Sequence, residues 1–138
     1  MALHDDLLAQ ADQLAHVEKN KPKQANLRRA VSAAYYALFH QLVDQSTRFL
    51  VSGPQREALR HQLARSFDHG QMKKATQTFA SPSPSGNAWR AVLGVAPSPA
   101  LVNVASAFIE LQEARHEADY DLARAFARGE VEALFSRT

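Results

Sequence analysis

The sequence predicts an all-α fold, an antiparallel up-and-down four-helix bundle with extra short helices and one long loop over residues 80–99. Apolar residues recur at steps of three and four along most of the 138 residues, which is the pattern of a buried helix face. No segment alternates β-branched or aromatic residues with polar ones for five or more positions, so strands are not expected. Hydrophobic residues make up 46% and charged residues 22%, which indicates one globular domain over 1–138.

The first two predicted helices are separated by Asn20 and Pro22. The first covers about residues 5–17. The second is long, from about Lys23 to Leu50, because Pro22 suits the first turn of a helix. Its expected apolar stripe is Leu27, Val31, Ala34, Leu38, Leu42 and Phe49, beside a face of small residues at Ala30, Ala33 and Ala37.

Three further helical segments are expected. Ser52-Gly53-Pro54 ends the second helix and opens a third that reaches about Phe67, and a short fourth helix covers about 71–79. Prolines, serines and a glycine then predict the long loop. The last long helix begins near Pro99 and is expected to run to Arg128, followed by one or two terminal turns over 130–135.

Composition excludes several classes of function. The chain has no cysteine, and therefore no disulfide, thiol nucleophile or cysteine-ligated metal. Its six histidines have no zinc-site spacing, and its five glycines form no phosphate loop, so we expect no metal and no cofactor. The acidic start is unlike an export signal, which favours a cytoplasmic protein. An uncharged run over 91–109 contains two prolines, which argues against a membrane span.

The positive charge is concentrated in one segment, although the formal net charge is only +2. The cluster consists of Lys19, Lys21, Lys23, Arg28 and Arg29. Such a segment can contact phosphates. It is also typical of a solvated loop and a first helical turn, and both interpretations stay open.

The last long helix carries a cation inside its apolar stripe. The expected stripe is Leu101, Val104, Phe108, Leu111, Ala118, Leu122 and Ala125. Helical geometry places Arg115 within it, where a charge is costly unless it is paired. Asp119, four residues later, lies on the same face and can pair with Arg115.

The long second helix has a matching polar line. Arg29, Tyr36 and His40 are seven and four residues apart and therefore share one side. If the two long helices pack antiparallel, Arg115, Asp119 and Tyr120 face Tyr36 and His40. One interpretation is a buried network that fixes helix register, and the other is a pocket for a phosphate or a base.

Two motifs in this order resemble the HEPN family, the higher eukaryotes and prokaryotes nucleotide-binding domain. They are RRAVSAAYYALFH over 28–40 and ARHEADYDL over 114–122. The resemblance implies a helical bundle, usually a homodimer, often encoded near a nucleotidyltransferase-like partner. It implies a setting of toxin–antitoxin, defence or RNA processing, in which many family members are metal-independent ribonucleases.

The ribonuclease signature of that family is an arginine followed, after four to six residues, by a histidine. Arg115-His116 matches its opening, but the histidine position falls on Tyr120, Asp121 or Leu122. Catalytic candidates are therefore limited to Arg115, His116 and His40. A chance-level match on the third helix, Arg56 with His61, is not assigned a role.

The function that follows from the resemblance is binding without catalysis. We expect a dimeric module that binds a nucleotide or RNA phosphate, or that acts as a toxin–antitoxin or defence interaction protein. The expected ligand-binding residues are Arg29, Tyr36, His40, Arg115, Asp119 and Tyr120. The alternatives are a divergent endoribonuclease that uses Arg115 with a nearby histidine, and a partner subunit that uses the region 80–109, in which Arg90 is the only charged residue.

Overall fold

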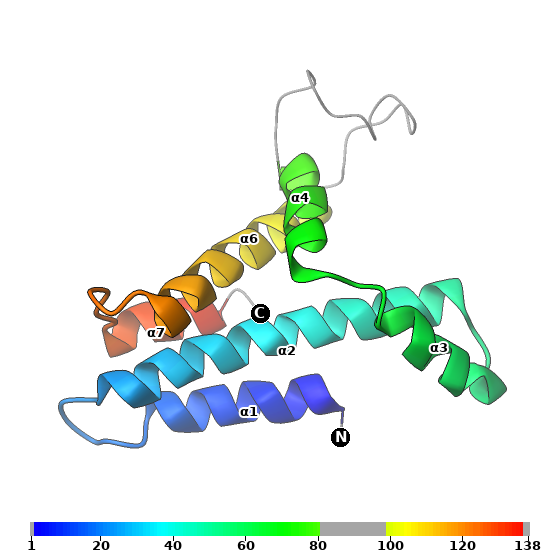
Figure 1. The fold of residues 1–138 in the computed structure, drawn as a ribbon. Coiled ribbons are helices and arrows are strands. Elements are labelled where there is room, and N and C mark those ends of the chain that lie inside the picture. The colour runs from blue at the N-terminus through cyan, green and yellow to red at the C-terminus, as the bar shows by residue number, and fades with distance from the viewer. Residues whose placement is uncertain (1, 81–98, 137–138) are drawn as a thin grey trace.

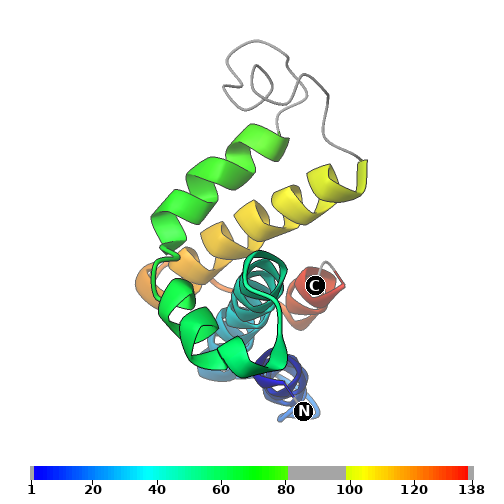
Figure 2. The ribbon, with the colours of Figure 1, turned by 90° about the vertical axis from the view of Figure 1, so that its right-hand side faces the viewer.

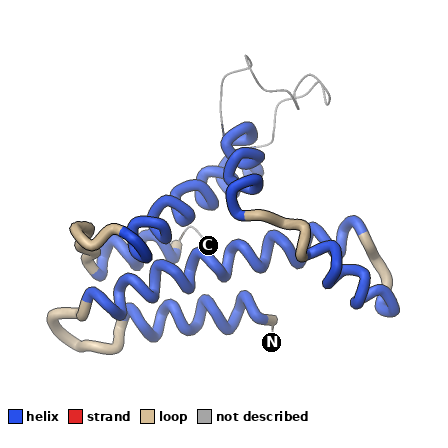
Figure 3. The backbone as a smooth tube through the Cα atoms, in the orientation of Figure 1, coloured by secondary structure: helices blue, strands red, loops and turns tan. Residues whose placement is uncertain are grey.

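Helix α2, Gln24–Leu50, is the element on which the other helices assemble (Figure 1). The computed structural model describes residues 2–80 and 99–136, apart from the side chains at 75 and 78–80. α1 (Leu3–Ala15) lies along one side of α2, and α6 (Pro99–Tyr120) crosses α2 on the opposite side. α7 (Arg128–Phe135) packs against both α1 and α2. The part of the chain that is described is all-helical with connecting loops, as expected (Figure 3).

Two shorter helices follow α2. A 3-10 turn, η1 (Pro54–Arg56), and α3 (Glu57–Ala64) fold back against the end of α2. Gly53 has a φ of 110°, which a residue with a side chain rarely adopts, and it makes this reversal possible. α4 (His69–Ala80) then leaves this corner and packs along α6 (Figure 2).

The core lies where α2 meets α1, α6 and α7. Alanines at Ala11, Ala15, Ala30 and Ala34 are completely buried, and their small size allows α1 and α2 to approach closely. The larger buried side chains are Leu27, Val31 and Tyr35 from α2, Phe108 and Leu111 from α6, and Val131 from α7. The stripe expected on α2 is therefore confirmed as far as Leu42, which is partly buried against the core, whereas Phe49 near the end of α2 is 87% exposed.

The largest correction concerns the last long helix. α6 ends at Tyr120, eight residues before the expected end at Arg128. Asp121 uses its side-chain carboxylate to accept the N–H of Ala123 at 3.0 Å, which favours a turn over further helix. At the end of the helix, the Arg28 guanidinium donates hydrogen bonds to the carbonyl oxygens of Ala118 (2.9 Å) and Asp121 (2.8 Å).

The expected apolar stripe of this helix is wrong at both ends. Leu122 and Ala125 lie in the loop after α6 and are exposed, Leu122 to 93%, while Leu101 and Val104 are exposed on the first turns. Phe126 replaces Leu122 in the core. It is held there by Gln24, whose amide donates to the Phe126 carbonyl at 2.6 Å and accepts the Phe126 N–H at 2.8 Å.

The remaining boundaries differ less. The third helix ends at Ala64 and not near Phe67, because residues 65–67 form a turn. Most of the expected loop over 80–99 lies outside the described residues. None of the helices in the described ranges is both long enough and apolar enough to cross a membrane.

Candidate functional site

Four aromatic rings and one guanidinium gather where α2, α4 and α6 meet. We call this group the Arg115 cluster and define it as Arg115, Tyr35, Tyr36, Phe39 and His69. Tyr35 and Tyr36 are consecutive on α2 and pack edge to face, with ring centroids 5.2 Å apart. The cluster lies at the crossing of the two long helices, which is where the inward-facing arginine was expected.

Arg115 is the charged centre of the cluster. Its side chain is only 13% exposed, and its guanidinium carbon lies 5.1 Å from the Tyr35 ring centroid and 6.0 Å from that of Tyr36. Both distances fit cation–π contacts. The Nη1 atom is 3.6 Å from an Asp119 carboxylate oxygen, which is an ion pair beyond hydrogen-bond distance. The Nε atom is buried and has no hydrogen-bond partner among the described residues.

His69 enters the cluster from the first turn of α4. Asp68 starts this helix by accepting the N–H of Gln71 at 3.0 Å, which places His69 at the first helical position. The imidazole stacks on Phe39 with centroids 4.0 Å apart and meets the edge of Tyr36 at 5.8 Å. Its Nδ1 atom lies 2.5 Å from the Tyr35 hydroxyl oxygen, so α4 is bonded directly to α2.

The electrostatic environment keeps both partners of this bond neutral. Burial raises the pKa of Tyr35 to about 12, although the nearby positive charge of Arg115 opposes the shift. Burial also lowers the pKa of His69, and the charge of Arg115 lowers it further. The cluster therefore presents one permanent cation beside an uncharged phenol and an uncharged imidazole.

Gln112 supports the cluster from α6. It is buried, and its amide donates a hydrogen bond of 3.0 Å to the His69 carbonyl. Its own carbonyl oxygen is buried without a partner among the described residues. One unpaired acceptor and one unpaired donor, Gln112 Oε1 and Arg115 Nε, thus lie three residues apart on α6. Buried polar groups are normally paired, so this site has unused hydrogen-bonding capacity.

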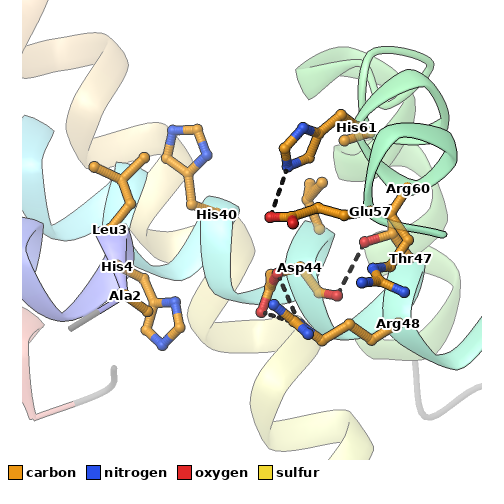
Figure 4. A pocket seen from close by; sticks show the side chains of 12 residues that line it. Ala2, Leu3, His4, His40, Asp44, Thr47, Arg48, Glu57, Arg60 and His61 are labelled. Carbon is orange, nitrogen blue, oxygen red and sulfur yellow. Dashed lines mark hydrogen bonds and ion pairs between the residues drawn. The ribbon is translucent and has the colours of Figure 1, made fainter. Parts of the chain in front are cut away.

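His40 lies between the Arg115 cluster and a separate pocket. Its ring is 6.3 Å from Tyr36, and it also lines a pocket of about 360 Å³ between α1, α2 and α3 (Figure 4). Burial, followed by the proximity of His4, lowers the pKa of His40. The polar walls of this pocket are already paired, with Asp44 bound to Arg48 at 3.0 Å and Glu57 near His61 at 3.7 Å.

The Arg56–His61 match does not form a site. His61 faces Glu57, and Arg56 lies in η1 with its side chain exposed. The buried arginine of this corner is Arg60, which donates to the carbonyls of Val51 (3.1 Å) and Gly53 (2.6 Å) and so fixes the reversal after α2. Across the described ranges, no three histidine, aspartate or glutamate side chains are placed to hold a metal ion.

The structure brings together only part of the expected set. Arg115, Asp119 and Tyr36 meet as expected, and His40 lies one turn beyond Tyr36. Tyr120 does not face them: it is 68% exposed at the end of α6, and its ring lies 5.1 Å from His116, which is also exposed. Arg29 is exposed on α2, whereas its neighbour Arg28 binds the end of α6.

Sequence reasoning missed Tyr35, His69 and Gln112. Tyr35 follows Leu27 and Val31 at steps of four, so the spacing contained the signal. His69 was interpreted as part of a helix stop, although Asp68 with Gln71 three residues later is typical of a helix start. Gln112 gave no signal, because an amide on a helix otherwise rich in charged residues is unremarkable.

Comparison with known proteins does not assign the chain to a family. No family model, no curated protein and no solved structure matches the chain. The function is therefore argued from the Arg115 cluster and from the two motifs.

Proposed function

We propose that this chain is a HEPN-like helical module that binds the phosphate group of a nucleotide or of RNA through Arg115. The proposal rests on the burial of the Arg115 guanidinium and on its unpaired donor. The guanidinium is largely withdrawn from water, and its Nε donor has no hydrogen-bond partner among the described residues. A phosphate supplies acceptor oxygens whose geometry matches the N–H donors of a planar guanidinium.

The competing interpretation is a buried network that only fixes the helices against each other. A network of that kind is expected to satisfy its donors, because an unpaired buried donor costs about 1–3 kcal/mol. Arg115 departs from that expectation, since its carboxylate partner Asp119 reaches only one nitrogen at 3.6 Å. The unpaired Nε therefore favours a ligand over a purely structural role. The four-helix-bundle description rests on the predicted helices and on the resemblance, and it stays a prediction. The homodimer and the nucleotidyltransferase-like partner rest on the resemblance alone and stay predictions as well.

The test is a titration of a fluorescent single-stranded RNA and of nucleotides with the purified chain. Arg115→Met keeps most of the side-chain volume and removes the charge. We expect it to raise Kd by roughly tenfold or more, because a charge-assisted hydrogen bond contributes about 1.5–3 kcal/mol. The matched control is Arg56→Met, which removes one exposed charge from η1 and is expected to change Kd by less than about threefold. Equal affinities of wild type and Arg115→Met would refute the proposal.

A second function, metal-independent RNA cleavage, is favoured by the position of His69. The signature lacks a histidine at positions 120–122, but α4 brings the imidazole of His69 to Tyr35, and Arg115 covers the ring of the same tyrosine. In this reaction the 2′-hydroxyl attacks phosphorus and the bond to the 5′-oxygen breaks. Arg115 would stabilise the negative charge on the phosphate oxygens. A histidine would move the proton released by the 2′-hydroxyl to the departing 5′-oxygen.

Cleavage is measured by incubating RNA with the chain in EDTA and analysing the products for 2′,3′-cyclic phosphate ends. We expect Arg115→Met and His69→Asn to abolish them, and His116→Asn to retain them because His116 is exposed and outside the cluster. Products that persist in Arg115→Met would come from another site. RNA binding without any cleavage would exclude the second function and retain phosphate binding as the only one.

A further inference from the structure

His69 is the side chain of α4 whose ring stacks on, and is hydrogen-bonded to, the aromatic residues of α2. Its imidazole is stacked on Phe39 and bonded to Tyr35, and its backbone carbonyl is held by Gln112. Beyond this first turn, α4 packs along α6, with Lys73 near Glu113 at 3.8 Å. His69 is therefore a titratable contact between the start of α4 and α2, next to the apolar packing of Met72 against the core.

We propose that His69 is a proton-controlled latch, which in its neutral form fastens the start of α4 over the Arg115 cluster and on protonation releases it. The latch itself is independent of any ligand. Its consequence for binding rests on the proposed function, because it regulates access to Arg115.

The hydrogen bond from Tyr35 determines which nitrogen of His69 carries the proton. Tyr35 is completely buried and its pKa is about 12, so the phenol keeps its proton throughout the physiological range. Its hydroxyl therefore donates and His69 Nδ1 accepts, which leaves the proton of the neutral ring on Nε2. The neutral imidazole is thus the form that the site accommodates.

Protonation of His69 removes this acceptor. Two donors then face each other across 2.5 Å, and the phenol must turn its hydrogen away from Nδ1, for which no other acceptor is found among the described residues. The surrounding charges act in the same direction. Arg115 from α6 and His40 from α2 disfavour an imidazolium, and only Asp68, next to His69 in the chain, favours it. A protonated ring is therefore better solvated outside the cluster.

The pH range follows from the direction of the shift. The pKa of His69 in the fold is lowered from 6.5, so the stabilisation from the latch is complete above 6.5. It is lost progressively as the pH falls from 6.5 to the pKa of the folded state. We expect release of α4 in mild acid and full closure at neutral pH.

The latch is tested by amide hydrogen exchange of residues 69–77 between pH 8 and 5, after correction for the intrinsic rate, with α1 as internal reference. We expect protection of this segment to fall by up to about tenfold per pH unit below 6.5, the slope for one proton. His69→Asn offers Tyr35 a polar atom near the Nδ1 position and cannot be protonated. In His69→Asn, the protection of residues 69–77 is expected not to depend on pH. Tyr36→Phe keeps the ring against His69, and its protection of residues 69–77 is expected to change with pH as in wild type. An unchanged wild-type profile, or the same slope in His69→Asn, would overturn the latch.

Binding is measured separately with a short phosphodiester oligonucleotide, whose charge is constant in this range. With the latch open, Arg115 is less covered and His69 adds a positive charge, so we expect Kd to fall as the pH drops below 6.5 in wild type but not in His69→Asn. Loss of protection at 69–77 without oligonucleotide binding at any pH would refute the proposed function and leave the latch standing. Binding that depends on Arg115 but has the same pH profile in both proteins would refute the latch and leave the function standing.

Discussion

Arg28 and Arg115 are two partly buried arginines on the facing helices α2 and α6, and they are bound in opposite ways. The guanidinium of Arg28 donates to backbone carbonyls at the end of α6, including Ala118 at 2.9 Å and Asp121 at 2.8 Å, and also to the carbonyl of Arg124. Arg115 lies over two aromatic rings, has one loose ion pair, and its buried Nε has no partner among the described residues.

The difference separates a structural arginine from a candidate binding residue. Carbonyl oxygens at a helix end need donors, and an arginine that supplies them is fully used by the fold. Arg128 is of the same kind, since it donates to the carbonyls of Ala15 at 2.9 Å and Lys19 at 3.2 Å. A guanidinium over aromatic faces keeps its donors for another acceptor. Burial alone does not distinguish the two cases, but the hydrogen-bond partners do.

The largest expected effect is on stability at the end of α6. Arg28→Met removes the donors to three carbonyls at and just after the end of α6, and we expect it to lower the free energy of unfolding by about 3 kcal/mol. Urea denaturation followed by circular dichroism measures the change.

Arg115→Met is the comparison variant. It removes a partly buried charge and leaves Asp119 sufficiently exposed to be hydrated, so we expect a change within about 1 kcal/mol. A loss of stability equal to that of Arg28→Met would mean that Arg115 is structural as well, and the contrast between the two arginines would fail.

A smaller effect is expected for Asp119→Asn. The carboxylate competes with an incoming anion for Arg115, and its removal leaves the guanidinium without its ion pair. We expect RNA affinity to rise by roughly threefold to tenfold, about 0.7–1.4 kcal/mol, in the titration used for Arg115→Met. A fall in affinity would show that Asp119 positions Arg115 for binding, and would reverse its assigned role.

The helices were largely predictable because periodicity is a local property. The expected second helix, about 23 to 50, agrees with Gln24–Leu50 within one residue, and the inward position of Arg115 followed from its neighbours on one helix. The end of α6 was not predictable in this way, since it depends on Arg28, which lies about 90 residues earlier in the chain. The apolar spacing continued through Leu122, and the one local signal against it was Asp121, whose carboxylate accepts the N–H of Ala123.

The site was predictable where its members lie on the two long helices, whose packing brings Arg115 to Tyr36. Arg115 with Asp119, and Tyr36 with His40, are pairs at four-residue spacing. His69 belongs to the same cluster through a contact between α4 and α2, and such a contact is fixed by packing and not by spacing. Tyr120 shows the converse, since it lies one residue after Asp119 but turns to solvent at the end of α6.

Two histidines give pH effects of opposite sign. The Asp12 carbonyl and the Glu132 carboxylate, which lies 2.7 Å from Nε2, raise the pKa of His16, where α1 meets α7. A raised pKa means that stabilisation is present below 6.5 and is lost as the pH rises through the pKa of the folded state. His69 behaves in the opposite way, because burial lowers its pKa.

Thermal unfolding of His16→Gln and His69→Asn from pH 5 to 8 separates the two contributions. Relative to wild type, we expect His16→Gln to be less stable in acid and nearly equal at pH 8. We expect the disadvantage of His69→Asn to be greatest at pH 8 and to shrink in acid. The His16 effect is the smaller, because this histidine and its partner are solvent-exposed. If the stability difference from wild type changed with pH in the same direction for both variants, the assigned causes of the two pKa shifts would be contradicted.

The smallest expected effect tests where α6 ends. Leu122 is 93% exposed in the loop after Tyr120, so Leu122→Ser is expected to change the free energy of unfolding by no more than about 0.5 kcal/mol. If α6 instead continued through residue 122, Leu122 would extend the stripe of Leu111 and Ala118, and the same substitution would cost about 2–3 kcal/mol. Leu111→Ala is the control, because Leu111 is completely buried and its truncation is expected to cost about 2–5 kcal/mol. A large loss in Leu122→Ser would therefore place residue 122 in the core. It would also remove the free carbonyls to which Arg28 donates, and with them the distinction between the two arginines.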